Sequence, residues 1–176
     1  MISKKDKEYV KLMNGQPLSY VMRACDMGDL GFGEERMYII NGRERETTSL
    51  ALHLSCPFRL VSQTGEIVFT AYDMYLSYDG ERMEGMSWDV RGINLYDKKT
   101  KEWMQKNPSL FVKDIKMNNR GDLRIVLSNN DRLEVFVNNS TDEECWRFFE
   151  MSSDEDDIKG IARRHLVMTG TGTSYE

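Results

Sequence analysis

The sequence contains no run of eighteen apolar residues, the shortest stretch from which a membrane-spanning helix is predicted. Its first ten residues, MISKKDKEYV, carry lysines but lack the apolar segment of a secretory signal. We therefore expect neither a membrane span nor export, and predict a cytoplasmic location.

Cysteine and histidine are scarce. The three cysteines, Cys25, Cys56 and Cys145, are odd in number, widely spaced and set among apolar residues, which predicts buried reduced thiols rather than a disulfide framework. A structural zinc site needs four converging Cys or His ligands. His53 and Cys56 are three residues apart, which places them on opposite faces of a strand. We expect no metal and no cofactor.

The signature motifs of three large enzyme classes are missing, because the sequence has no GxxxxGK[ST], no GxSxG and no HExxH. The glycines of GDLGFGEE do not follow the GxGxxG order, so we interpret this stretch as a glycine-rich turn. Asp26, Asp29 and Asp73 would support acid–base catalysis only if the fold brought them together. We assign no catalytic residue, and enzymatic activity stays an open question.

The composition predicts one compact domain over residues 1–176. About 40% of the 176 residues are hydrophobic, enough to build one core. Charged residues make up 30% and the formal net charge is -5, which opposes non-specific attraction to nucleic acid or anionic lipid. We expect neither nucleic acid nor a membrane as the partner.

The first part of the chain predicts a helix followed by hairpins. Ser3 can act as the N-cap of an amphipathic helix over 4–14, with Asp6 three residues later in an Asp variant of the capping box. β-Hairpins are predicted over 36–72, because the Asn-Gly pair at 41–42 is preferred for a type I′ turn between two extended stretches.

The second part predicts further strands. Apolar alternation broken by the turns NNRGD and SNND indicates a β-meander over 110–150, and DKKTKEWMQKNPS indicates a short helix ended by Pro108. The apolar residues of 18–25 fit both helical and strand spacing, so this segment stays open. We expect a strand near 86–90. The last residues, 170–176, should fray. The fold class is α+β, predominantly antiparallel β, as a meander, sandwich or partly closed barrel with one or two short helices.

The stretch SLALHLSCPFRL alternates with the period of a strand. Its even positions are apolar and predict a core row, at about 1.5 to 3 kcal/mol for each fully buried large side chain. Pro57 lacks a backbone donor, so we expect the strand to lie at an edge or to be bulged there.

The odd positions of the same stretch are polar and include His53 and Arg59. One interpretation is a solvated sheet face with a cross-strand ion pair. The other is a polar groove that binds a ligand with Arg23, His53, Arg59 and Asp73.

The stretch DEECWRFFEMSSDEDD, residues 142–157, holds eight acidic side chains against one basic one. Its local charge is -7, so the remaining residues sum to +2. Solubility is the ordinary explanation. The alternative is a face that binds a basic protein partner. The acidic residues assigned to that face are Asp142, Glu143, Glu144, Asp154, Glu155, Asp156 and Asp157.

Several blocks, MRACDMGDLGFG, ALHLSCPFRL, GEIVFTAYDMY and DRLEVFVNNSTDEECWRFFE with HLVMTGTG, resemble in the same order the signature blocks of an uncharacterised family of small bacterial cytosolic proteins. The resemblance covers roughly residues 15–172, implies a bacterial source and a single domain, and supplies no catalytic residues. Small β-rich bacterial proteins also resemble the immunity proteins of toxin systems.

Two classes of function follow. The first is a protein-binding module, immunity-protein-like, with a basic partner such as a toxin. The alternative is a small-ligand-binding protein or enzyme that uses a polar groove near His53, Arg59 and Asp73. The sequence does not predict an oligomeric state.

Overall fold

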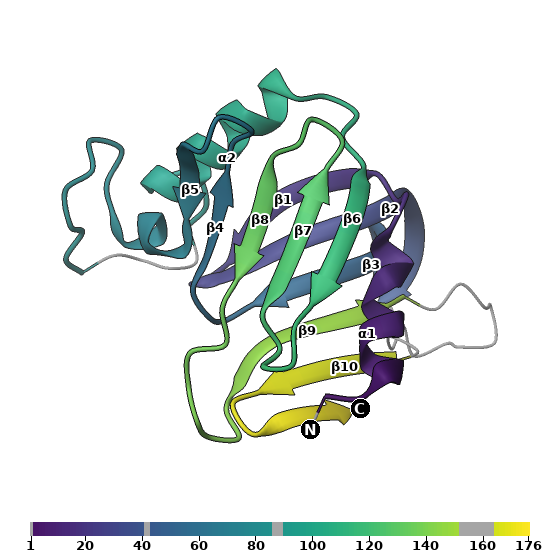
Figure 1. The fold of residues 1–176 in the computed structure, drawn as a ribbon. Coiled ribbons are helices and arrows are strands. Elements are labelled where there is room, and N and C mark those ends of the chain that lie inside the picture. The colour runs from purple at the N-terminus through teal and green to yellow at the C-terminus, as the bar shows by residue number, and fades with distance from the viewer. Residues whose placement is uncertain (1, 41–42, 86–89, 152–163) are drawn as a thin grey trace.

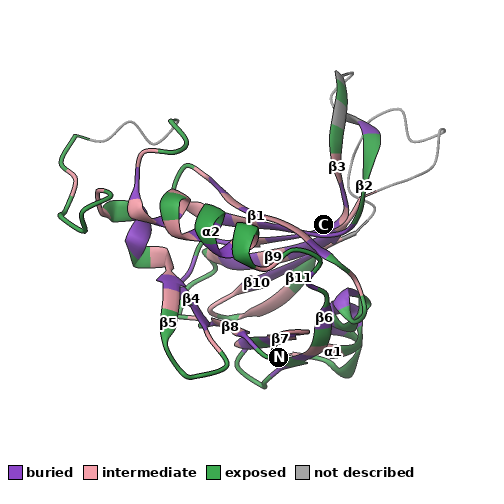
Figure 2. Ribbon diagram, turned by 90° about the horizontal axis from the view of Figure 1, so that it is seen from above, coloured by how far each residue is buried: buried purple, intermediate pink, exposed green. Residues whose placement is uncertain are grey.

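Two antiparallel sheets face each other in the computed structural model, which describes residues 2–40, 43–85, 90–151 and 164–176 (Figures 1 and 2). The six-stranded sheet contains, in spatial order, β1 (Leu18–Ala24), β2 (Met27–Ile40), β3 (Arg43–Leu54), β9 (Glu144–Glu150), β10 (Arg164–Thr169) and β11 (Gly172–Tyr175). The five-stranded sheet contains, in spatial order, β5 (Ile67–Thr70), β4 (Phe58–Val61), β8 (Arg132–Val135), β7 (Leu123–Leu127) and β6 (Val112–Met117). The predicted α+β class, dominated by antiparallel β structure, is confirmed, and the sheets do not close into a barrel.

The core fills the space between the sheets. Leu50, Leu52 and Leu54 of β3 face it from one sheet, while Phe58 and Leu60 of β4 face it from the other. All five are at most 5% exposed. The buried apolar row is therefore confirmed, but it comes from two strands in opposite sheets.

The chain changes sheet at Pro57. The Ser55 N–H donates to the Cys145 carbonyl at 2.8 Å, and the Phe136 N–H donates to the Pro57 carbonyl at 2.9 Å. Because Pro57 has no N–H to continue a ladder, the strand stops there and resumes in the other sheet. The expected edge or bulge at this position is instead a crossing between sheets.

In the described part of the chain, two α-helices accompany the sheets. α1 (Lys4–Val10) begins with the predicted capping box, in which the Asp6 N–H donates to Ser3 Oγ at 3.2 Å and the Ser3 N–H donates to Asp6 Oδ2 at 2.7 Å. It continues as a short 3₁₀ helix over Lys11–Met13, so the helix predicted over 4–14 is confirmed. α2 (Leu95–Lys106) is longer than expected and contacts β1 and β5 (Figure 1).

The first residue of α2 could not be predicted from apolar spacing, because the helix begins at a polar N-cap residue. The side chain of Asn94 accepts from the Asp97 N–H at 2.9 Å. A second 3₁₀ helix, η2 (Ala71–Tyr75), packs against α2. Among the described residues, no helix is long and apolar enough to cross a membrane.

The tail expected to fray forms β11, which pairs with β10. The hydroxyls of Thr173 and Tyr175 donate to the two oxygens of buried Asp6, at 2.9 and 2.8 Å. Strand pairing and these bonds hold the segment against α1, so the prediction of a frayed tail is wrong.

The remaining local predictions have mixed outcomes. The segment left open at 18–25 is strand β1, and the hairpins over 36–72 and the meander within 110–150 are present. The turn at 41–42 and most of the strand expected near 86–90 lie outside the described residues.

Candidate functional site

Arg23 holds α2 against β1. Its side chain is fully buried and makes a two-pronged bond to Asp97, with Nε to Oδ1 and Nη2 to Oδ2 both at 2.9 Å. Its Nη1 donates to the Cys25 carbonyl at 2.8 Å. Its Nη2 also donates to the Val90 carbonyl. A guanidinium with these partners inside the fold stabilises the structure and is not directed toward a ligand.

Asp73 has a similar structural role in η2. Its Oδ2 accepts from the Thr70 N–H at 2.8 Å, and Lys99 of α2 lies 3.1 Å from its Oδ1. The carboxylate therefore caps one helix and pairs with another.

His53 lies on the outer face of the six-stranded sheet. Its Nε2 is 3.5 Å from Asp29 Oδ1, a buried oxygen without a hydrogen-bond partner among the described residues. The His53 ring meets the Phe149 ring edge-on with centroids 4.8 Å apart, and His165 stacks on the same Phe149 ring at 4.9 Å. Burial, followed by the nearby Arg147 guanidinium, lowers the pKa of His165.

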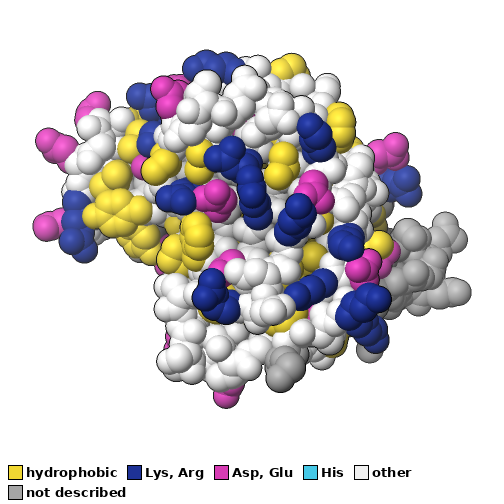
Figure 3. All heavy atoms as spheres, viewed as in Figure 1, with side chains coloured by type: hydrophobic (Ala, Val, Ile, Leu, Met, Phe, Trp, Pro, Cys, Tyr) yellow, Lys and Arg dark blue, Asp and Glu magenta, His cyan; other side chains and the backbone are white. Residues whose placement is uncertain are grey.

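Arg59 lies on the outer face of the other sheet. It stands opposite Glu134 in the β4–β8 register, and Arg59 Nη2 is 2.8 Å from Glu134 Oε2. This is the cross-strand ion pair of the solvated-face interpretation. A shallow groove of about 660 Å³ beside it is lined by both signs of charge, including Lys116, Arg124 and Asp122. Figure 3 shows Lys and Arg side chains spread over this face.

The structure does not bring the four predicted ligand-binding residues together. Arg23 and Asp73 each bind α2, whereas His53 and Arg59 lie on the outer faces of opposite sheets. The change of sheet at Pro57 separates the last two, and sequence periodicity carries no information about it.

The predicted acidic face is only partly described. Asp142 and Glu143 are exposed on the connection between β8 and β9, and Asp142 accepts a hydrogen bond from the Thr171 hydroxyl. Glu144 pairs with Arg147 at 2.5 Å. Asp154, Glu155, Asp156 and Asp157 lie outside the described residues.

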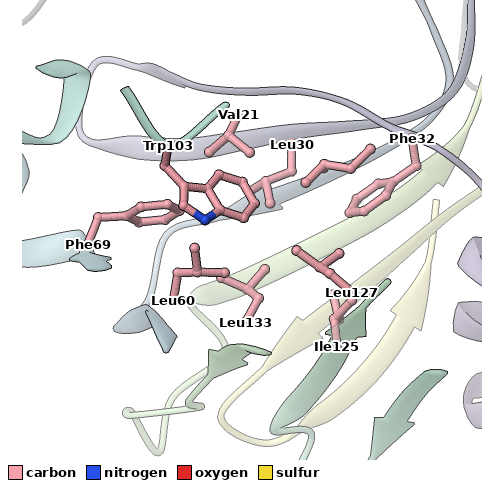
Figure 4. Close-up of a pocket in the computed structure, with 10 residues that line it drawn as sticks. Val21, Leu30, Phe32, Leu60, Phe69, Trp103, Ile125, Leu127 and Leu133 are labelled. Carbon is pink, nitrogen blue, oxygen red and sulfur yellow. The ribbon is translucent and has the colours of Figure 1, made fainter. Parts of the chain in front are cut away.

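The cavity described between the two sheets is too small for a ligand. The space between the sheets contains an apolar cavity of about 10 Å³, lined by side chains such as Leu30, Trp103 and Leu133 (Figure 4). A cavity of this size is at the lower limit for one water molecule, and an apolar lining offers that water no partners.

A larger hollow lies on the surface, at one end of the sandwich. We call it the tyrosine cleft; its volume is about 330 Å³. Its lining includes Asp26, Ser55, Pro57, Tyr72, Tyr75 and Asn138. Tyr72 and Tyr75 belong to η2 and are 61% and 38% exposed, with ring centroids 6.1 Å apart.

Sequence reasoning missed these tyrosines. Tyr72, Tyr75 and Tyr78 recur every third residue, the period of a 3₁₀ helix, and this spacing was the available signal. Asp26 comes from the distant β1–β2 turn, and no pattern in one sequence connects it to η2.

The thiols near the cleft differ in exposure. All three cysteines are free, and Cys56 and Cys145 are buried, as predicted. Burial raises the pKa of Cys56 to about 12, so its thiolate is scarce near neutral pH. Cys25 is exposed, because it lies in the two-residue β1–β2 turn outside the sheet. Its φ is positive, at 55°. The prediction of burial is therefore wrong for Cys25.

Within the described part of the chain, no group of three or more His, Cys, Asp or Glu side chains is arranged to hold a metal ion. Comparisons with known proteins found no matching family, no matching curated protein and no matching solved structure.

Proposed function

We propose that this chain is a bacterial, cytosolic protein-binding module that recognises a basic protein partner, in the manner of an immunity protein that neutralises a toxin. The observation that carries the proposal is a group of exposed tyrosines, of which Tyr72 and Tyr75 line the tyrosine cleft and Tyr78 follows three residues after η2. Tyr72, Tyr75 and Tyr78 are 61%, 38% and 43% exposed within seven residues of chain. Large exposed aromatic side chains of this kind are enriched at the centres of protein interfaces.

Charge near the cleft favours a basic partner. Asn138 of the cleft lies on the same β8–β9 connection as exposed Asp142 and Glu143. Asp142 and Glu143 follow Asn138 by four and five residues, which span at most about 18 Å, so the acidic side chains lie within reach of the same interface. Acidic residues beside an aromatic centre would speed the approach of a basic protein.

The ligand-binding alternative has less support. Arg23, His53, Arg59 and Asp73 have separate partners in separate places, and the cavity between the sheets measures only about 10 Å³. A small-molecule site usually encloses about 300 to 1,000 Å³ with converging polar groups. The tyrosine cleft has such a volume, but none of these four residues lines it.

The test begins with affinity capture from a bacterial extract on the immobilised protein, followed by purification of each captured protein. Stopped-flow mixing then measures its association rate with the wild-type chain and with a variant in which six of the seven acidic residues of the predicted face are neutralised; Glu144 is kept because it pairs with Arg147. The substitutions are Asp142→Asn, Glu143→Gln, Asp154→Asn, Glu155→Gln, Asp156→Asn and Asp157→Asn.

We expect association about tenfold slower at low salt, with the difference shrinking as ionic strength rises. The double variant Glu66→Gln, Glu102→Gln is the control, because both side chains are exposed elsewhere on the surface. A partner whose association rate ignores both salt and the acidic substitutions would contradict the proposal.

A further inference from the structure

We propose that the tyrosine cleft is a receptor for a cationic side chain, with arginine preferred over lysine. This inference rests on the proposed function, because it names the group of the basic partner that the surface recognises. The proposal places the binding of this side chain in the tyrosine cleft, a site that the net charge of the chain does not identify.

The cleft is built from four segments that the fold fixes in place. Asp26 comes from the β1–β2 turn, Ser55 from the crossing between sheets, Tyr72 and Tyr75 from η2, and Asn138 from the β8–β9 connection. The crossing is anchored by its two backbone hydrogen bonds, and η2 is capped by a buried carboxylate. The side chains of the cleft therefore stand on a preformed frame, which reduces the entropy lost when a ligand binds.

The cleft wall is aromatic and open. Tyr72 is 61% exposed, and among the described residues no cation lies over its ring. The Tyr72 and Tyr75 rings are tilted by 38° to one another, so they present aromatic surface to the same hollow. Figure 3 shows hydrophobic side chains gathered on this side of the molecule, over η2 and the chain after it.

The charge in the cleft is negative. Asp26 is the one charged side chain among its described lining residues, and no ion pair to it occurs in the described structure. The Tyr75 hydroxyl lies 3.5 Å from Asp26 Oδ2, at the long limit of a hydrogen bond. Burial, together with this carboxylate, raises the pKa of Tyr75.

A cationic side chain satisfies both features at once. Its alkyl stem and charged group can pack on the tyrosine rings while the head reaches Asp26, which combines a cation–π contact with a charge-assisted hydrogen bond. The same chain shows the contact nearby, because Lys98 Nζ lies 5.6 Å from the ring centre of Tyr78.

Other ligands fit less well. A carboxylate or phosphate would meet Asp26 with no cation in the described lining to offset the repulsion. Arginine has an advantage over lysine, because its planar guanidinium stacks on aromatic rings and its additional N–H groups can reach the oxygens of Ser55 and Asn138.

The experiment uses three capped tripeptides, Gly-Arg-Gly, Gly-Lys-Gly and Gly-citrulline-Gly, titrated into the ¹⁵N-labelled protein and followed by amide chemical shifts. Citrulline has the shape of arginine without its charge. We expect the arginine peptide to shift the amides of Asp26, Ser55, Tyr72, Tyr75 and Asn138, the lysine peptide to bind more weakly, and the citrulline peptide to shift them little.

Two variants test the recognising groups. Asp26→Asn removes the charge and Tyr72→Leu removes the aromatic ring; both side chains are exposed, and the amide spectrum reports whether the fold is intact. Each should weaken arginine-peptide binding about three- to fivefold. Asp114→Asn is the matched control, since it removes one carboxylate from the outer face of the five-stranded sheet and should leave binding unchanged.

Equal binding of the arginine and citrulline peptides, or of the Asp26→Asn and Asp114→Asn variants, would overturn the inference. The outcome is separable from that of the proposed function. A purified partner sensitive to neutralisation of Asp142 and Glu143 but indifferent to Asp26→Asn would overturn the cleft and leave the binding module standing. Arginine-selective shifts in the cleft would support the receptor even if no partner's association depended on the acidic face.

Discussion

Breaking the buried pair of Arg23 and Asp97 should lower stability, and the cost should depend on which partner is removed. Replacing one member of a buried ion pair costs about 3 to 5 kcal/mol, because the other charge is left without compensation. The Arg23 side chain is fully buried and that of Asp97 is 11% exposed.

The surroundings decide the order of the two effects. In Arg23→Met, the Asp97 carboxylate keeps the Gly92 N–H at 2.7 Å and the Ile93 N–H at 3.3 Å, and it lies in the positive first turn of α2. We therefore expect a loss near the lower limit, about 3 kcal/mol.

In Asp97→Asn, the buried guanidinium loses its two-pronged bond to a carboxylate and keeps neutral backbone carbonyls such as those of Cys25 and Val90. The loss should approach about 5 kcal/mol. For a chain of this size, about 2 to 4 °C is lost per kcal/mol, so the melting temperature should fall by roughly 6 to 12 °C in Arg23→Met and 10 to 20 °C in Asp97→Asn.

Urea unfolding followed by tryptophan fluorescence measures both variants. Arg36→Met is the control, because the Arg36–Glu34 pair is exposed and should leave the midpoint unchanged. An Arg23→Met variant at least as unstable as Asp97→Asn would refute the reasoning about compensation, and a loss below about 1 kcal/mol in both would refute the claim that the pair anchors α2.

Two further predictions concern titration and thiol chemistry. Burial acts to raise the pKa of Asp6, but hydrogen bonds from Ser3, Tyr175 and Thr173 outweigh it, so the pKa is lowered in the folded state. The ionised Asp6 therefore stabilises the fold at pH values above its unfolded pKa of about 3.9. This contribution is lost as the pH falls through the lower folded pKa. In urea unfolding, Asp6→Asn should therefore be less stable than wild type at pH 7, with a gap that narrows below about pH 4; a constant gap would contradict this account. Titration with a thiol reagent should label Cys25 rapidly in the native protein and reach three thiols only after denaturation, whereas a total of one would indicate a disulfide.

Local patterns predicted most of the strands, because alternation along one strand reports directly on which side is buried. Leu50, Leu52 and Leu54 are an example, and their burial follows from period alone. The position of β4 in the opposite sheet cannot be predicted from this period, because Pro57 ends the backbone pairing of one strand without determining where the next strand pairs. The tail failed for a similar reason, since Tyr175 is held by Asp6, a residue at the far end of the sequence.

The candidate site was harder to predict, because its members are ordinary residues separated along the chain. Tyr72 lies at the end of the hairpins predicted over 36–72, Tyr75 lies in the following stretch without a clear strand period, and Asp26 is one of many surface acids. The polar row with His53 and Arg59 is periodic in the sequence, yet the crossing between sheets places its two ends on the outer faces of opposite sheets. Polar side chains form a cleft only where the fold brings them together, and local patterns in a single sequence do not show which distant residues meet.

The small cavity between the sheets also bears on how the molecule responds to pressure. Pressure unfolds proteins largely because voids in the native state disappear on unfolding, with volume decreases of about 20 to 100 mL/mol. The cavity between the sheets of this chain is only about 10 Å³ and is lined by apolar side chains. Loss of this cavity on unfolding would release little volume, so this cavity contributes little to the pressure sensitivity of the fold.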